Sequence, residues 1–235
     1  MTTDQGTASS SKGRRRGGPL RIDRIKIVEA ARRLDPQVMT MQAVADELGV
    51  DRKALNYHVT DREGLLRLVA ADVFESGFSA LFTSALARAD QRIPEAWQSG
   101  LHAWAVAVRD SMVSTGVLAA YYEIDGTTLA VFEPVEMVLQ RMLDAGFDLT
   151  TAGRGLITIT RTAMGLGRDA VLAQQSGEHP QFREVSRVLS RATGDDEYPA
   201  LRGMAAAGLN SPADATAQFD FEVGLVLDAL GRLAP

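Results

Sequence analysis

Five side chains that suit contacts with nucleic acid lie between positions 52 and 58: Arg52, Lys53, Asn56, Tyr57 and His58. Cationic side chains neutralise backbone phosphates, and an asparagine side chain hydrogen-bonds either a phosphate oxygen or the edge of an adenine. A short helix that projects these groups can enter the major groove of DNA, where an α-helix fits. The chemistry that this segment predicts is therefore recognition of double-stranded DNA.

The residues around this segment indicate two helices joined by a tight turn. Thr40 suits the N-cap of the first helix, and Asp51 can cap the second, which is expected to end near position 58. Gly49 stops the first helix, because glycine adopts the positive φ that such a turn requires. Ala45 supplies a small side chain where the two helices approach each other. The small core that the helices share is expected to contain Val44, Leu48, Val50 and Leu55.

The N-terminal part of the chain is basic, whereas the remainder is acidic. Residues 1–66 hold 12 Lys and Arg against 9 Asp and Glu, and residues 67–235 hold 13 against 21. A basic end on an acidic body indicates that only this end meets a polyanion. Residues 1–19 have almost no apolar side chains and are expected to be a disordered basic arm, which either lies in an adjacent minor groove or stays solvated. The arginines that we expect to contact DNA here are Arg14, Arg15, Arg16 and Arg21.

The stretch from Ile22 to Leu66 resembles the DNA-binding domain of TetR-family transcriptional repressors. The matching segments are Thr40-Met41, Val44-Ala45, Leu48-Gly49-Val50, Ala54-Leu55, Tyr57-His58-Val59 and Asp61-Arg62-Glu63-Gly64-Leu65-Leu66. The resemblance implies that residues 20–66 form a three-helix DNA-binding domain with a helix-turn-helix. It also implies DNA contacts for Thr40, Arg52, Lys53, Asn56, Tyr57 and His58, and a backbone phosphate contact near Arg62.

One position departs from the family pattern. The family often places a tyrosine directly after the leucine of the third helix, whereas Asn56 follows Leu55 here. Asn56 therefore either binds a phosphate or reads an adenine. Tyr57 either contacts DNA or packs within the domain, and His58 either contacts DNA or braces the domain.

Helical periodicity continues through the rest of the chain, without strand-like alternation of useful length. Helices are expected over about residues 20–34, 61–81, 94–115, 128–145, 150–175 and 182–192, and from Ser211-Pro212 onward, where proline takes the first helical position. The sequence thus predicts an all-α fold, with the DNA-binding domain followed by a larger helical domain over residues 67–235. The resemblance implies that this larger domain binds a small-molecule ligand and dimerises.

A ligand-responsive regulator needs a cavity, whose walls are expected on the helices over residues 94–115, 128–145 and 150–175. Ligand sites are mostly apolar with a few polar groups, and the candidates are the large aromatic, sulfur-containing and polar side chains of these helices. They are Trp97, His102, Trp104, Arg109, Tyr121, Tyr122, Phe132, Met137, Met142, Phe147, Thr158, Arg161 and Met164. His102 and Arg161 stand out because each is expected amid apolar neighbours. Such side chains equally suit a plain helical core; as a pocket, they suit a fairly large, partly aromatic effector.

Two reading helices imply a twofold dimer and a palindromic operator. The helices over residues 150–175 and 211–233 are the candidates for the interface, because the first is rich in glycine and the second has a strong apolar face. The glycines that permit close approach of helices are Gly153, Gly155, Gly165 and Gly167. The alternative is that both helices complete the core of one protomer.

The remaining sequence features exclude several other classes of protein. The chain has no cysteine, so disulfides and thiolate metal sites are excluded. The three histidines lack metal-ligand spacing, and His179 is expected to face solvent. Catalytic motifs such as a Gly-rich phosphate loop are absent, so we expect no enzyme, metal or cofactor. With no secretory signal or membrane span, we expect a cytoplasmic, ligand-responsive repressor, the alternative being an activator or an architectural DNA-binding protein without a sensor.

Overall fold

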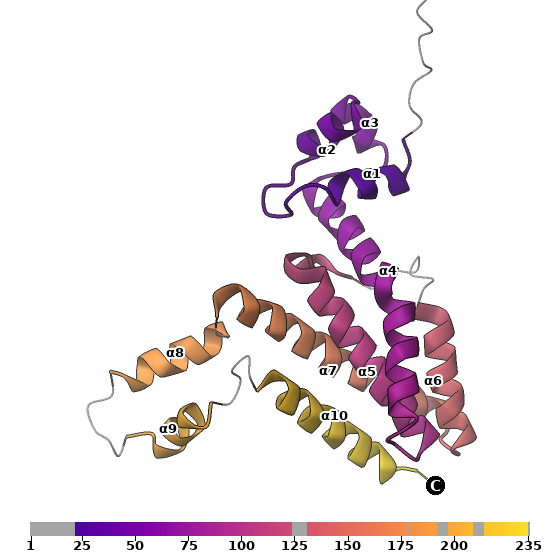
Figure 1. Cartoon of the computed structure of the whole chain (residues 1–235), viewed down its shortest axis with the longest axis vertical. Helices are drawn as coiled ribbons and strands as arrows, with labels where there is room; N and C mark the ends of the chain where they lie inside the picture. The colour runs from indigo at the N-terminus through magenta and orange to yellow at the C-terminus, as the bar shows by residue number, and fades with distance from the viewer. Residues whose placement is uncertain (1–21, 124–130, 178, 192–196, 209–213, 235) are drawn as a thin grey trace, which may run out of the picture.

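The computed structural model describes residues 22–123, 131–177, 179–191, 197–208 and 214–234. Within these ranges every regular element is a helix (Figure 1), which confirms the all-α fold. The elements are α1 (Arg24–Ala31), α2 (Met41–Leu48), α3 (Arg52–Asn56), α4 (Arg62–Ala89), α5 (Ala96–Thr115), the 3-10 helix η1 (Gly116–Tyr121), α6 (Phe132–Asp144), α7 (Leu149–Ser176), α8 (Pro180–Leu189), α9 (Pro199–Ala206) and α10 (Ala215–Gly231). None of the described helices is both long and apolar enough to cross a membrane.

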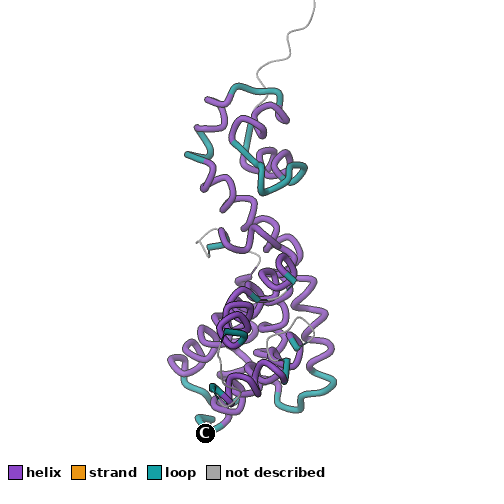
Figure 2. Tube along the Cα trace, turned by 90° about the vertical axis from the view of Figure 1, so that its left-hand side faces the viewer, coloured by secondary structure: helices purple, strands orange, loops and turns teal. Residues whose placement is uncertain are grey.

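The helices are arranged as a head, a body and a projecting pair. The head consists of α1–α3, the body of α4–α7 with η1 and α10, and the projecting pair of α8 and α9, which extends away from the body in Figure 1. Figure 2 shows the head and the body as separate lobes that are joined along α4. Because α4 is the continuous link, its position decides where the head lies relative to the body.

Side-chain caps fix the helices of the head where the sequence predicts them. The hydroxyl of Thr40 accepts a hydrogen bond from the amide of Ala43 at 3.1 Å. The carboxylate of Asp51 accepts one from the amide of Lys53 at 2.7 Å. Between these caps, Gly49 has a φ of 67°, which glycine adopts without steric cost. The predicted helix-turn-helix is therefore confirmed by its own hydrogen bonds.

α1 is shorter than the helix expected over residues 20–34. Asp23 caps its start by accepting a hydrogen bond from the amide of Lys26 at 2.9 Å. After Ala31 the backbone tightens, because the amides of residues 33 and 34 bond to carbonyls three positions earlier. The helix therefore ends before it reaches the proline that was expected to stop it.

Aromatic side chains around α4 form the centre of the body. Phe78 is fully buried, and its ring centroid lies 5.2 Å from that of Trp104 on α5. Phe74 stacks on Tyr122, just after η1, with 4.0 Å between the ring centroids. The indole N–H of Trp104 donates to the hydroxyl of Thr160 on α7 at 2.7 Å. One core thus joins α4, α5, η1 and α7.

Two of the four glycines singled out on α7 serve packing within the protomer. A Cβ atom placed on Gly155 would lie 3.0 Å from Leu230 Cδ2 of α10, and one on Gly167 would lie 2.5 Å from Met112 Cβ of α5. For these two positions the core alternative is correct. A Cβ atom on either of the other two glycines, by contrast, would meet no atom of the described residues within 4 Å: Gly153 and Gly165.

The C-terminal elements differ most from the expectations. α9 lies between the helix expected over residues 182–192 and the one expected from Ser211-Pro212, where no helix was predicted. It is only eight residues long and buries none of them, so little in the sequence distinguishes it from a loop. It follows Tyr198, whose φ is 61°. α10 begins at Ala215, and the expected start at Ser211-Pro212 lies outside the described residues.

Candidate functional site

α3 and the turn after it present the predicted DNA-contacting side chains on an outer surface of the head. Arg52, Lys53 and Asn56 are exposed, and Tyr57 is 89% exposed. An aromatic side chain with that exposure is not held in a core, so packing within the head is not the role of Tyr57. His58 is half-buried, and its ring lies edge-on to that of Tyr57 with 5.5 Å between the centroids. Whether His58 contacts DNA or braces the domain stays a prediction.

Arg62, the first residue of α4, turns back onto the loop that precedes α2. Its Nε donates to the carbonyl of Met39 at 2.7 Å, and its Nη2 lies 3.4 Å from the carbonyl oxygen of Pro36. Arg62 thus holds the loop that leads into Thr40, which is itself exposed at the start of α2. These hydrogen bonds use Nε and Nη2, and Arg62 is exposed, so the phosphate contact expected near Arg62 stays a prediction.

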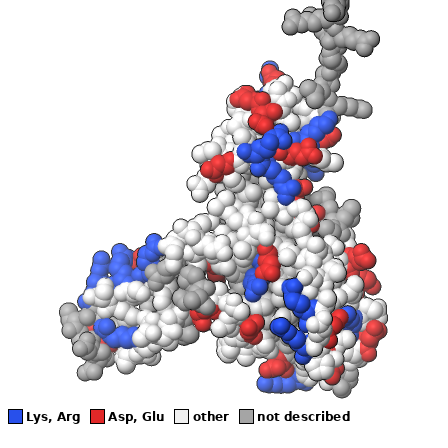
Figure 3. Space-filling view, in the orientation of Figure 1, with Lys and Arg blue, Asp and Glu red and all other residues white. Residues whose placement is uncertain are grey.

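Acidic and basic side chains are interspersed over the visible face of the head (Figure 3). Arg33, after α1, pairs with Glu47 on α2 at 2.6 Å, so part of the positive charge is balanced internally. The exposed cations of α3, Arg52 and Lys53, therefore supply positive charge at α3 and not over the whole face of the head. The arginines expected to add to it lie outside the described residues: Arg14, Arg15, Arg16 and Arg21.

A groove of about 310 Å³ separates the head from the body. Arg32 and Leu34 line it from the end of the head helix α1, and Thr115 and Leu118 line it from α5 and η1. Val69 contributes the wall on α4. The end of α5 therefore reaches the underside of the head, where a displacement of α5 would be felt by α1.

A larger cavity, of about 470 Å³, opens between α5, α7, α10 and the projecting pair. Its charged lining consists of Arg109 and Asp110 from α5, Asp169 from α7 and Glu222 from α10, with His179 at the cap of α8. Its volume falls in the range of small-molecule sites, which are concave and combine apolar walls with a few polar groups.

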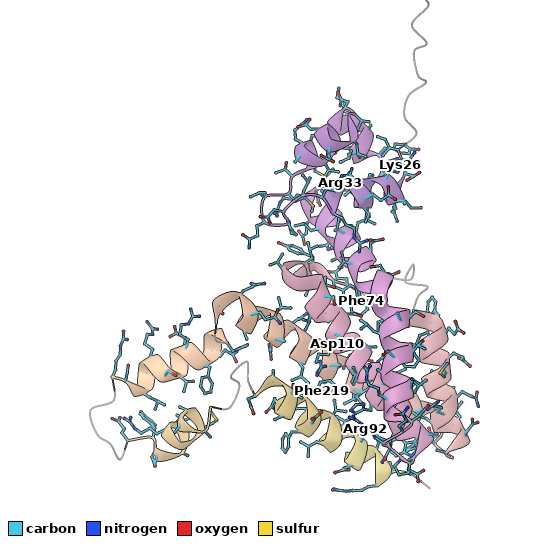
Figure 4. All side chains as sticks on the ribbon, viewed as in Figure 1. Lys26, Arg33, Phe74, Arg92, Asp110 and Phe219 are labelled. Atoms are coloured by element: carbon cyan, nitrogen blue, oxygen red, sulfur yellow. The ribbon has the colours of Figure 1, made fainter. Side chains whose placement is uncertain are left out.

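The guanidinium of Arg109 is held from two sides. Its Nη2 lies 2.7 Å from Asp110 Oδ1, and its Cζ lies 4.1 Å from the centroid of the Phe219 ring on α10. Figure 4 shows Asp110 and Phe219 on neighbouring helices in this region. The ion pair balances the charge of Arg109, and the aromatic face fixes its direction.

His179 lies at the edge of the cavity, and the expectation that it faces solvent is wrong. Its side chain is only 16% exposed, because it caps α8 and turns back toward α7. Its Nδ1 accepts a hydrogen bond from the amide of Gln181 at 3.3 Å, so the proton of the neutral ring is on Nε2. That Nε2 lies 3.4 Å from Asp169 Oδ1.

Apolar side chains line the cavity beside the charged ones. They include Val113 of α5, Leu166 of α7, Phe182 and Val185 of α8, and Met204 of α9. The cavity thus combines apolar and charged side chains, and the projecting pair supplies much of the apolar part.

Twelve of the thirteen candidates for ligand contact lie elsewhere in the body. Trp97, Trp104, Tyr122, Met142 and Phe147 are buried in the core; His102, Tyr121 and Met164 are half-buried; Phe132, Met137, Thr158 and Arg161 are exposed; none of the twelve lines the 470 Å³ cavity. Arg161 lies one turn after the exposed Ile157 on α7, so it is not buried within this protomer. The remaining candidate, Arg109, does line the cavity.

His102, which was expected to lie amid apolar neighbours, is a half-buried side chain of the body. Its Nδ1 is buried without a hydrogen-bond partner among the described residues. Its ring lies edge-on to Phe219, with 6.2 Å between the centroids. Burial lowers the pKa of His102, and the nearby charge of Asp220 opposes that shift while those of Arg109 and Arg92 add to it.

The comparison with protein families decides the class of the chain. The profile of the tetracyclin repressor-like, C-terminal domain matches residues 92–232, more than half of the chain. The chain belongs to the TetR family of transcriptional regulators. The TetR-type domain thus spans α5 to α10, including every helix that lines the larger cavity. No curated protein matches the sequence.

Solved structures of TetR regulators share the fold at low sequence identity. A possible TetR family regulator from Streptomyces coelicolor A3(2) aligns with a TM-score of 0.70 and 20% identity over 90% of this chain and 100% of its own. ActR of Streptomyces coelicolor, in complex with actinorhodin, gives 0.64 and 18% over 92% and 98%. A TetR variant from Acinetobacter baumannii AYE, in complex with minocycline, gives 0.55 and 19% over 92% and 99%.

Proposed function

We propose that this TetR-family chain is a cytoplasmic, ligand-responsive repressor that binds a palindromic operator as a homodimer. The observation that carries DNA binding is the exposed surface of α3 and the residue after it. Arg52, Lys53, Asn56 and Tyr57 are exposed there, and Asp51 caps the start of the helix. A helix held in this way fits the major groove and brings cations to phosphates and an amide to base edges.

Dimerisation is supported by exposed apolar side chains on two adjacent helices of the body. α7 and α10 pack against each other where Gly155 meets Leu230. On their outer faces, Ile157 is 52% exposed and Leu225 is 54% exposed, and Phe221 is exposed one turn before it. Contiguous exposed apolar surface marks interaction sites, and a second copy of the same face would cover it around a twofold axis.

Ligand control is supported by the cavity and by its connection to the head. ActR and the TetR variant were solved with actinorhodin and minocycline bound, and a DNA-binding protein without a sensor has no use for a cavity of this kind. Arg109, Asp110 and Val113 of α5 line the cavity. Ser114, Thr115 and Leu118, which follow directly, line the groove beneath α1. A ligand that moves this part of α5 therefore changes the surface on which the head rests. The ligand can shift the regulator between a DNA-binding and a non-binding state only if it binds these two states with different affinity.

Titration of mixed-sequence duplex DNA with the full chain, followed by fluorescence anisotropy across a range of salt, tests the proposal. Because phosphate contacts release counterions, the logarithm of the association constant should fall linearly with that of the salt concentration. Each of the variants Arg52→Ala and Lys53→Ala should reduce the magnitude of the slope by about 1 if its cation neutralises one phosphate. Absence of binding, or a slope that neither variant changes, would contradict DNA binding through α3.

A further inference from the structure

We propose that the 470 Å³ cavity binds an organic cation with a bulky apolar body, and that Asp169 and Glu222 select its positive charge. The inference rests on the proposed ligand-responsive function and names the chemical class of the ligand. It depends on the balance of charge around the cavity and on the large apolar side chains that line it as well.

Negative charge exceeds positive charge in the lining. Three carboxylates and a single guanidinium face the cavity. Arg109 and Asp110 balance each other across 2.7 Å. In the described part of the chain, no lysine or arginine forms an ion pair with Asp169 or Glu222. The cavity therefore carries two carboxylates that no lysine or arginine of the described residues neutralises.

His179 is the one basic side chain next to these two carboxylates among the described residues that line the cavity. Its Nε2 lies 3.4 Å from Asp169 Oδ1, and its Nδ1 accepts a hydrogen bond from the amide of Gln181 at 3.3 Å. Even with His179 beside Asp169, the lining keeps an excess of negative charge, because Glu222 has no basic partner among the described residues.

Glu222 is oriented by a neutral group. The amide nitrogen of Gln218, one turn earlier on α10, donates to Glu222 Oε1 at 2.7 Å. The bond uses one carboxylate oxygen and leaves Oε2 available to a ligand. Asp169 is exposed at the rim of the cavity and Glu222 is half-buried, so a ligand that covers Glu222 removes water from its carboxylate. A neutral or anionic ligand leaves that carboxylate uncompensated, whereas a cation pairs with it.

The apolar side chains of the lining suit the apolar body of such a ligand. Phe182 and Val185 of α8, Val113 and Leu166 of the body, and Met204 of α9 all line the cavity. A methionine adapts its shape to an irregular partner, and an aromatic ring attracts a delocalised cation through its face. Together with the carboxylates, these side chains favour a ligand that has an ammonium or similar charge and a bulky hydrocarbon portion.

A pair of ions of matched shape and opposite charge tests the proposal. Tetraphenylphosphonium and tetraphenylborate each carry four phenyl rings, so they differ chiefly in the sign of the charge. Isothermal titration calorimetry of the full chain should show that the phosphonium ion binds at least about tenfold more tightly than the borate ion, since like charges close to the borate oppose its entry.

Two variants link the preference to the cavity. Glu222→Gln and Asp169→Asn should each weaken phosphonium binding by about tenfold and leave borate binding equal or stronger. Asp228→Asn is the matched control, because it makes the same change of charge at an exposed position of α10 outside the cavity, and it should leave both affinities within about twofold. Thermal unfolding of each variant followed by circular dichroism confirms that it folds.

Several outcomes would overturn the inference. They are a failure of both ions to bind, equal or tighter binding of the borate ion, and phosphonium binding that neither cavity variant weakens. The salt-dependent DNA titration separates this failure from that of the proposed function. If DNA binding through α3 holds while the preference for the cation does not, the ligand class is wrong and the regulator remains; if the reverse is found, the cavity preference stands without the DNA-binding proposal.

Discussion

Arg32, just after α1, and Asp72, in the middle of α4, form an ion pair across the junction of head and body. Arg32 Nη1 lies 3.3 Å from Asp72 Oδ2, and Arg32 Nη2 donates to Ser76 Oγ at 3.0 Å one turn further along α4. Because α4 continues into the body, these contacts fix the angle at which α1 rests on it. Each of the two charged side chains is 42% exposed, so the pair restricts orientation more than it stabilises the fold.

Replacement of Asp72 by asparagine should therefore affect DNA binding more than stability. We expect the free energy of unfolding to fall by no more than about 1 kcal/mol, since partly exposed ion pairs contribute little. Operator affinity should fall by about threefold to tenfold, because fewer molecules hold both heads in the binding orientation. Chemical unfolding and anisotropy with a selected operator measure the two quantities. Glu184→Gln, which breaks the Glu184–Arg187 pair on α8 away from the head, is the control; an equal effect of both variants on DNA binding would refute the role of Asp72.

The exposed ring of Tyr57 should contribute to DNA binding and not to folding. We expect Tyr57→Ala to leave the melting temperature within about 2 °C of the parent, because the side chain is 89% exposed and its removal opens no cavity. Operator affinity should fall by about tenfold or more if the ring contacts DNA, since one such contact is worth about 1–3 kcal/mol. Differential scanning fluorimetry and anisotropy provide the readouts. Loss of stability together with unchanged affinity would show that Tyr57 braces the head.

The close approach of α7 to α5 should not tolerate a methyl group. In Gly167→Ala the new Cβ would lie 2.5 Å from Met112 Cβ and 3.0 Å from the carbonyl oxygen of Arg109. The helices must separate, and we expect the free energy of unfolding to fall by about 1–3 kcal/mol. The matched control is Gly77→Ala in the middle of α4, where the nearest atom is Leu81 Cδ1 at 4.0 Å. Because alanine is the better helix former, this control should stabilise the protein by up to about 1 kcal/mol.

Urea unfolding of the two alanine variants measures both effects with opposite expected signs. A stable Gly167→Ala protein would contradict the close packing of α7 on α5. Since the carbonyl of Arg109 lies at this contact, the same variant should also alter ligand binding in the cavity.

The depressed pKa of His102 makes stability depend on pH. Burial lowers this pKa from the ordinary value of 6.5. Between the folded pKa and 6.5 the unfolded chain binds a proton that the folded chain excludes. The free energy of unfolding should therefore decrease as the pH falls through 6.5, and the loss is complete below the folded pKa. Asp90, whose pKa is also lowered, chiefly by its hydrogen bond from Arg141, acts in a separate window below 3.8.

Urea unfolding between about pH 7.5 and about pH 5 measures the contribution of His102. The variant His102→Gln keeps a polar side chain of similar size but does not titrate. It should lose less stability than the parent over this interval. Identical pH dependence of the two proteins would show that His102 is not the group responsible.

The features of the head were accessible from the sequence because they are local. Thr40 and Asp51 bond to amides two or three positions away, and Gly49 takes its positive φ at the turn between them. Residue type and spacing therefore suffice to predict them. The sequence did not determine whether Tyr57 is exposed, because the same pattern of residues allows its ring either to pack within the domain or to face the DNA.

The cavity was not accessible from the sequence because it depends on the approach of five helices. Asp169 and Glu222 each look like ordinary solvent-facing residues of an amphipathic helix. His179 lies in a polar stretch, and only the cap on α8 turns it inward. The large aromatic residues that the sequence emphasised, such as Trp104, are used instead to fill the core between α4, α5 and α7.

Selection of DNA from a random pool by the full chain tests the central claim most directly. Two copies of α3 related by a twofold axis should enrich an inverted repeat whose half-sites are centred about one helical turn, or a multiple of it, apart. Arg52→Ala should weaken the enrichment of the bases that the half-sites share. Enrichment of no sequence, or of a single asymmetric site, would contradict the account of a dimeric regulator that reads DNA with this helix.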